Sequence, residues 1–227
     1  MEMEIVVPNE LPVMTLSGVA FFPQALLPLH IFEPRYRQML SDVLAKDRLM
    51  AVVGLDTSNS AQEAAFEPPH QVATVGIIRA CQKRENGTSN LLLQGLCRAR
   101  ITSILSEDPY RIISIQALQS EPGDDPQYHE QLRRELAQLL NKKRQLGAEL
   151  PEELTEFLHT VKDPDTFVDL AAFSLCENQA LKQQLLETLE VTTRFELFNR
   201  HLRQEISEMQ FRRKLQGELS DDRIAEN

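Results

Sequence analysis

The sequence predicts an α+β protein in which a curled β-sheet with one early helix precedes an all-α bundle that ends in a long helix. Strand-like alternation continues as far as Leu118, and helical periodicity takes over after Glu121. The net charge changes at the same place, from −2 through Ser120 to −8 beyond it. We therefore expect a β-barrel unit at 1–120, a helical unit at 121–216 and a disordered tail at 217–227.

The most concentrated apolar surface near the N-terminus predicts two strands and a helix. Leu11–Leu16 alternates as a half-buried strand does. In the second strand, Leu26–Phe32, odd-numbered residues face one side, and Leu26, His30 and Phe32 face the other. Pro28 has no N–H to donate, so this strand should be an edge or carry a bulge. A helix begins at Pro34, and its predicted apolar stripe is Tyr36, Met39, Leu40, Val43 and Leu44.

Further strands complete the predicted sheet. Leu49–Leu55 is apolar throughout, which indicates a strand buried on both faces, and Asp56–His70 reads as a long surface loop. Val72–Gln82 and Asn90–Leu105 flank an Asn-Gly turn and should form an antiparallel hairpin, with a bulge or bend at Gly95. Tyr110–Gln119 is the last strand. About six short strands favour a closed or nearly closed barrel.

Helix start signals recur in the second half. Asp125-Pro126 and Asp163-Pro164 each place an N-cap acid before proline, Pro151 opens another helix, and Thr193 begins a capping-box pattern. These signals predict four or five helices. The last, from about Thr193 to Lys214, has an apolar stripe for which the preceding helix can supply a partner. The stripe comprises Phe195, Phe198, Leu202, Ile206 and Met209, and the partner residues are Leu181, Leu185 and Leu189.

Composition excludes several classes of function. The net charge of −10 opposes binding to a phosphate backbone. The N-terminus has no basic segment before an apolar one, and no apolar run reaches the length of a membrane span, so we expect neither a secretory signal nor a membrane anchor. The three cysteines form no CxxC pair, which argues against a zinc site or disulfide framework and favours a reducing cytoplasm.

Four blocks of sequence, in order, resemble the N-terminal substrate-binding domain of Lon proteases. They are LPVMTLSGVAFFPQALLPLHIFEPRYRQML, VATVGIIRACQKRENGTSNLLLQGLCRARI, DPDTFVDLAAFSL and LLETLEVTTRFELFNRHLRQEI. The resemblance implies a PUA-like β-barrel followed by a helical bundle. It also implies a non-enzymatic module that binds unfolded or extended polypeptide segments, without a cofactor, in concert with a protease or a chaperone.

The modules that follow this domain in a full Lon protease have no counterpart in the sequence. A P-loop requires GxxxxGK[ST], and the dipeptide Gly-Lys does not occur. The Ser-Lys dyad of the Lon peptidase belongs to a region that the chain lacks. The resemblance therefore implies a stand-alone relative of the binding domain rather than an ATP-dependent protease.

The turn around Phe21 and Phe22 is the first candidate binding site. Two adjacent phenylalanines in a connection cannot both enter one core, so one of them, with Leu26, is a candidate apolar patch for an extended peptide. The alternative is that both rings fill the gap between barrel and bundle.

A basic strip supports a second hypothesis, RNA binding, since PUA-like barrels elsewhere often bind RNA. Its residues lie on the predicted hairpin and are Arg79, Lys83, Arg84, Arg98 and Arg100. The shortage of aromatic residues for base stacking and the acidic net charge make nucleic acid the weaker hypothesis.

A third hypothesis is an enzyme with an unrecognised site between barrel and bundle. His30, Glu33 and Arg35 form the nearest polar constellation, but the five histidines show no HxH or HExxH spacing, so we expect structural roles and no metal. The cysteines lie in apolar patterns, which favours buried, unreactive thiols.

Overall fold

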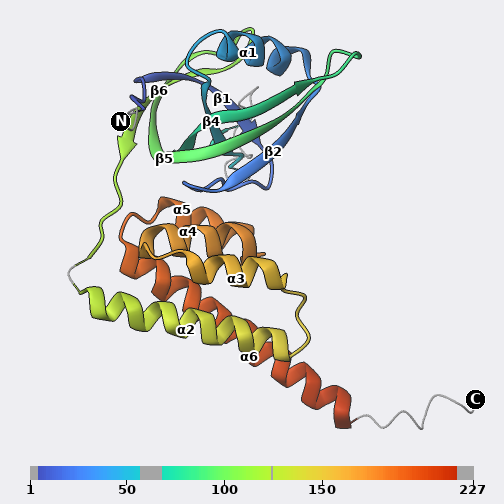
Figure 1. Ribbon diagram of the computed structural model, residues 1–227, viewed down its shortest axis with the longest axis vertical. Coiled ribbons are helices and arrows are strands. Elements are labelled where there is room, and N and C mark those ends of the chain that lie inside the picture. Colours follow the sequence, from blue (N-terminus) through green and yellow to red (C-terminus); the bar gives the residue numbers. More distant parts are fainter. Residues whose placement is uncertain (1–4, 57–67, 124, 219–227) are drawn as a thin grey trace, which may run out of the picture.

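The computed structural model describes residues 5–56, 68–123 and 125–218, and in Figure 1 a barrel of strands lies beside a bundle of helices. The barrel comprises β1 (Glu10–Leu16), β2 (Leu26–Ile31), α1 (Pro34–Leu44), β3 (Leu49–Gly54), β4 (Val72–Lys83), β5 (Ser89–Ser106) and β6 (Ile112–Leu118). The bundle comprises α2 (Pro126–Gln145), α3 (Glu152–Thr160), α4 (Pro164–Leu175), α5 (Gln179–Glu187) and α6 (Val191–Glu218). This order confirms the predicted α+β class.

The six strands form one sheet that closes on itself. The strand order is β2-β5-β4-β3-β1-β6, and an additional pairing of β6 with β5 closes the ring. Closure depends on the length of β5, because its first half pairs with β2 and β4 and its second half pairs with β6. β2 lies outside the ring, so within the described residues its second edge has no strand partner. The predicted barrel and the edge position of β2 are both confirmed.

A bulge in β5 lets the connection between β1 and β2 approach the sheet. The register between β4 and β5 shifts where Gly76 faces Gly95. The N–H of Gly95 donates to the carbonyl of Ala25, and its own carbonyl accepts from the N–H of Gln24, both at 2.9 Å. A Cβ at position 95 would collide with the carbonyl oxygen of Phe22, so only glycine fits there. The prediction of an irregularity at Gly95 is confirmed.

Burial follows the predicted patterns in α1 and β3 with one exception. All six residues of β3 are buried, because separate apolar clusters cover its two faces. Four residues of the predicted α1 stripe are buried, whereas the fifth, Leu44, is 36% exposed.

Two predicted helix caps are present and one is absent. The Asp125 carboxylate accepts from two backbone N–H groups at the start of α2, and Asp163 accepts from one at the start of α4. The capping box at Thr193 is wrong, because α6 already begins at Val191 and the Thr193 hydroxyl donates to the side chain of Glu190.

The main partner of α6 is α2, which lies beside it in Figure 1 and runs in the same direction. Tyr128 donates to Glu196 at 2.9 Å near the start of both helices, and Lys143 pairs with Glu205 at 3.0 Å further along. The sequence analysis named only Leu181, Leu185 and Leu189 of the preceding segment as the partner, whereas α5 contacts α6 less extensively than α2 does. The paired residues lie 62 and 68 residues apart, so the local sequence carries no signal of this pairing.

Two further predictions concern segments at the edge of the description. Most of the predicted loop Asp56–His70 lies outside the described residues, which omit 57–67. The predicted tail begins at residue 217, but α6 continues to Glu218, and residues 219–227 lie outside the described residues.

Candidate functional site

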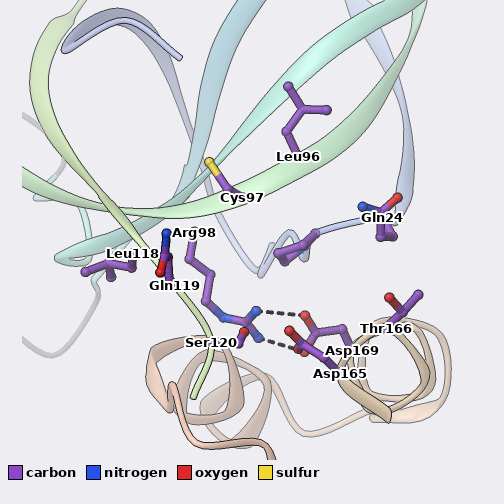
Figure 2. A pocket seen from close by; sticks show the side chains of 11 residues that line it. Gln24, Leu96, Cys97, Arg98, Leu118, Gln119, Ser120, Asp165, Thr166 and Asp169 are labelled. Carbon is purple, nitrogen blue, oxygen red and sulfur yellow. Dashed lines mark hydrogen bonds and ion pairs between the residues drawn. The ribbon is translucent and has the colours of Figure 1, made fainter. Parts of the chain in front are cut away.

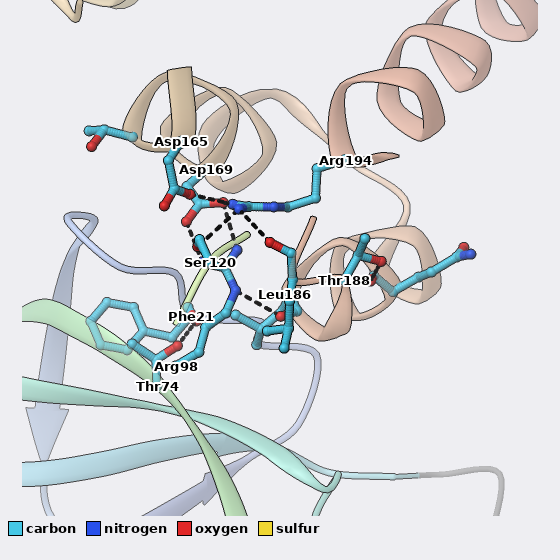
Figure 3. Close-up of polar contacts among 12 residues, drawn as sticks. Phe21, Thr74, Arg98, Ser120, Asp165, Asp169, Leu186, Thr188 and Arg194 are labelled. Carbon is cyan, nitrogen blue, oxygen red and sulfur yellow. Dashed lines mark hydrogen bonds and ion pairs between the residues drawn. The ribbon is translucent and has the colours of Figure 1, made fainter. Parts of the chain in front are cut away.

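An ion-pair network links the barrel to the bundle (Figure 3). Arg98 of β5 donates two hydrogen bonds to Asp169 of α4, at 2.7 and 2.8 Å, and a third to the carbonyl of Leu186 in α5 at 2.9 Å. Arg194 of α6 also donates to Asp169, and it donates to Ser120 at 3.0 Å. Arg98 and Asp169 are each 2% exposed. One carboxylate therefore joins a strand to two helices.

Beside this network lies a cleft of about 400 Å³ between barrel and bundle (Figure 2). It is the natural place for the enzyme hypothesis, because Arg98, Asp165 and Asp169 line it. Burial raises the pKa of Asp169, and the guanidinium groups of Arg98 and Arg194 oppose that rise. Both oxygens of Asp169 already accept hydrogen bonds from arginine, and these three bonds hold the carboxylate between the two guanidinium groups. The arrangement joins the barrel to the bundle.

The two phenylalanines of the predicted peptide patch are buried. Phe21 is 1% exposed, with its ring 6.3 Å from that of Phe173 in α4, and Phe22 is 0% exposed, with its ring 5.8 Å from the Arg98 guanidinium. The prediction that one of them is exposed is wrong. The alternative, in which both fill the gap between barrel and bundle, is confirmed because the connection folds back against the helices.

Leu26, the third residue of that patch, is 50% exposed at the start of β2. Phe32, just after the strand, is 61% exposed, and its ring stacks on that of His30 with centroids 6.0 Å apart. Pro28 is also exposed, so the predicted outer face of this strand is open. We call Leu26, Pro28, His30 and Phe32 the β2 face. The sequence analysis placed Phe32 on this face but omitted it from the candidate site.

The backbone of β2 presents polar groups along its open edge. The hydrogen bond from Gly95 to Ala25 fixes which groups point toward β5. Because bonded and non-bonded pairs alternate along an antiparallel ladder, the backbone groups of Leu26, Pro28 and His30 point outward. Proline offers no donor, which limits pairing with another strand.

The predicted basic strip is not continuous. Arg98 is buried in the ion-pair network, so its assignment to an exposed RNA-binding face is wrong. The strand alternation places Arg98 and Arg100 on one side of β5, but the bundle covers only Arg98. Arg79 of β4 donates to Gln94 of β5 at 2.6 Å. Lys83 is the last residue of β4, and Arg84 lies in the turn of the hairpin. The other four residues of the predicted strip, Arg79, Lys83, Arg84 and Arg100, are exposed.

The remaining polar candidates have partners within the fold. His30 Nδ1 lies 2.6 Å from Asn90 Oδ1, and Arg35 pairs with Glu33 at 3.0 Å. Burial raises the pKa of the Cys97 and Cys176 thiols, which disfavours the nucleophilic thiolate. Across the described part of the chain, no three His, Cys, Asp or Glu side chains converge as metal ligands would. Nor does any helix there have both the length and the apolar character needed to cross a bilayer.

Comparisons with known proteins point to one family. A family model described as the ATP-dependent protease La (LON) substrate-binding domain matches residues 10–204. The Lon protease of Syntrophus aciditrophicus is 26% identical over 217 residues, covering 95% of this chain and 28% of that protein. The Lon protease of Dictyoglomus thermophilum is 26% identical over 216 residues, covering 95% of this chain and 27% of the relative. The chain thus spans about a quarter of the length of these curated relatives.

Solved structures share the fold. The N-terminal domain of a Mycobacterium avium complex Lon protease matches with a TM-score of 0.63 and 17% identity, covering 87% of this chain and 98% of that one. The Lon N-terminal domain protein from Xanthomonas campestris matches with a TM-score of 0.60 and 18% identity, covering 84% and 97%. Because the family model covers most of the chain, this protein belongs to the family of Lon substrate-binding domains.

Proposed function

We propose that this protein binds extended, apolar polypeptide segments on the β2 face and presents them to a protease or chaperone, without catalysing a reaction itself. The observation that carries the proposal is the exposure of Leu26 and Phe32 on the same face of an edge strand. Exposed apolar side chains grouped beside an open strand edge suit the capture of an unfolded chain. Family membership supports the same activity. The cytoplasmic location remains a prediction from the cysteine pattern.

Side-chain burial rather than strand pairing should supply most of the affinity. Pro28 lacks a donor in the middle of the open edge, so the ladder of backbone hydrogen bonds to a bound chain would be interrupted there. Burying the exposed half of Leu26 and of Phe32 contributes about 1 kcal/mol each. Such modest contributions suit a surface that captures many sequences and releases them again.

The test compares Leu26→Ser/Phe32→Ser with the wild type for binding to a reduced and alkylated, fluorescently labelled unfolded protein, measured by anisotropy. Loss of about 2 kcal/mol should weaken binding about thirtyfold. Phe157→Ser is the matched control, because Phe157 is 51% exposed but lies on α3, away from the β2 face. Equal binding by all three proteins would overturn the assignment of this surface.

The same assay separates polypeptide binding from the RNA hypothesis. Binding of the unfolded protein should change little with salt, whereas binding of RNA falls steeply as salt rises. Displacement of the unfolded protein by RNA at low concentration would favour the RNA hypothesis.

A further inference from the structure

A groove of about 520 Å³ separates helix α1 from the tip of the β4–β5 hairpin, at the end of the barrel far from the bundle in Figure 1. One face of α1 forms one wall, and the two strands with their turn form the other. The volume lies within the range of ordinary ligand sites. The lining residues are Pro34, Arg37, Gln38, Leu40, Ser41, Leu44, Cys81, Lys83, Gly87 and Ser89.

The charge of this groove is opposite to that of the whole chain. Arg37 and Lys83 line it, none of its lining residues is acidic, and the protein carries a net charge of −10. Within the described part of the chain, neither of these two side chains forms an ion pair or a hydrogen bond. The Arg37 guanidinium lies against Gly87, in the tight space left by the absent glycine side chain. Two unpaired cations facing one groove favour an anionic ligand.

The rest of the lining is part apolar and part polar. Leu44 of α1 and the half-buried Cys81 of β4 offer apolar surface over the buried Leu40, beside the polar Gln38, Ser41 and Ser89. Leu44 is 36% exposed, although the periodicity of α1 predicted its burial. An apolar side chain that stays partly exposed beside two cations marks a place for a ligand with an apolar part and a negative group.

We propose that this groove binds the carboxyl-terminal residue of a polypeptide, with an apolar side chain against Leu44 and the free carboxylate near Arg37 and Lys83. The inference rests on the proposed polypeptide binding and names a class of substrate, chains with an apolar C-terminus. An α-carboxylate is fully ionised at neutral pH. The planar guanidinium can bind both of its oxygens, and the ammonium adds a point charge.

Other anions fit the groove less well. A nucleotide base would require an aromatic surface to stack on, and none of the lining residues is aromatic. A free fatty acid has the same two chemical parts but lacks a peptide backbone, so the experiment includes it as a competitor.

The test uses two N-acetylated, fluorescently labelled peptides that end in two leucines, one with a free carboxylate and one with a C-terminal amide. The wild type should bind the free acid about tenfold more tightly, and the preference should shrink at high salt. Arg37→Gln/Lys83→Gln should abolish the preference and leave binding of the amide unchanged. Arg84→Gln removes a cation from the same hairpin outside the groove, so it should keep the preference.

The outcomes distinguish this inference from the proposed function. Equal binding of acid and amide by the wild type would overturn the groove assignment and leave the β2 face intact. Failure to bind either peptide or the unfolded protein would overturn both. Displacement of the free acid by decanoate at equal or lower concentration would overturn the inference by identifying a fatty-acid site. A thermal unfolding curve for each variant confirms that it is folded.

Discussion

Arg98 of β5 and Asp169 of α4 form a bidentate ion pair, 71 residues apart in sequence and 2% exposed on each side. Asp169→Ala would leave Arg98 and Arg194 buried without their shared carboxylate. Breaking a buried pair in this way typically costs 3–5 kcal/mol, so we expect a loss of about that size in the free energy of unfolding. Urea denaturation followed by far-UV circular dichroism measures it.

Asp165→Asn is the control for this prediction. Asp165 contacts Arg194 at 2.7 Å through a buried oxygen, but its side chain is 35% exposed and Arg194 keeps its ion pair with Asp169, so the loss should cost less than the loss of Asp169. Equal effects of the two substitutions would contradict a special role for Asp169.

The connection before β2 gives a second prediction. Phe22 is fully buried and Leu26 is half exposed, although both belonged to the same candidate patch. Phe22→Ala should lower the free energy of unfolding by about 3–5 kcal/mol, because it opens a cavity between barrel and bundle. Leu26→Ala should lower it by less than about 1 kcal/mol. Chemical denaturation of both variants measures the difference.

The Phe22→Ala and Leu26→Ala variants also separate an effect on binding from an effect on stability. At a temperature where both variants are folded, Leu26→Ala should weaken capture of an unfolded protein, whereas Phe22→Ala should affect capture only through the folded fraction. A folded Phe22→Ala protein with specifically impaired capture would contradict the burial of this ring.

Local patterns predicted most of the barrel because the signals act within a few residues. Alternation predicted the two faces of β2, and Pro28 predicted its edge position. Asn86-Gly87 predicted the hairpin turn. Asp125 and Asp163 marked helix starts for the same reason, since a capping side chain accepts from a backbone N–H only two or three residues further on.

The candidate site was harder to predict because burial depends on distant elements. Alternation placed Arg98 and Arg100 on one side of β5, but it gave no indication that α4 and α5 cover only the first of them. The Phe21-Phe22 connection depends on Gln24, which has a positive φ of 62°. Turn signals rest on glycine or asparagine at such positions, so nothing local indicated the fold-back against the helices.

Gly95 carries a third prediction. Its N–H and carbonyl bond to the connection before β2, and an added Cβ would meet the backbone of Phe22. Gly95→Ala should therefore lower the free energy of unfolding by about 1–3 kcal/mol, because backbone atoms on both sides must shift. Hydrogen exchange should rise in β2 and the 21–25 connection before it rises in β3. Unchanged stability would show that the connection moves without cost.

Tyr110 supports a prediction about pH. Its hydroxyl donates to Asp42 of α1 at 2.8 Å, and burial together with this carboxylate raises the pKa of Tyr110 to about 12 from 10.0. A folded state that holds the proton more tightly than the unfolded state gains stability that is complete below pH 10 and is lost as the pH rises toward 12. The stability difference between wild type and Tyr110→Phe should therefore decrease over this range.

Urea unfolding of both proteins in steps from neutral pH upward measures this difference. The titration of other groups cancels in the difference, because both proteins contain those groups. A difference that stays constant through the alkaline range would contradict the coupling of Tyr110 to Asp42.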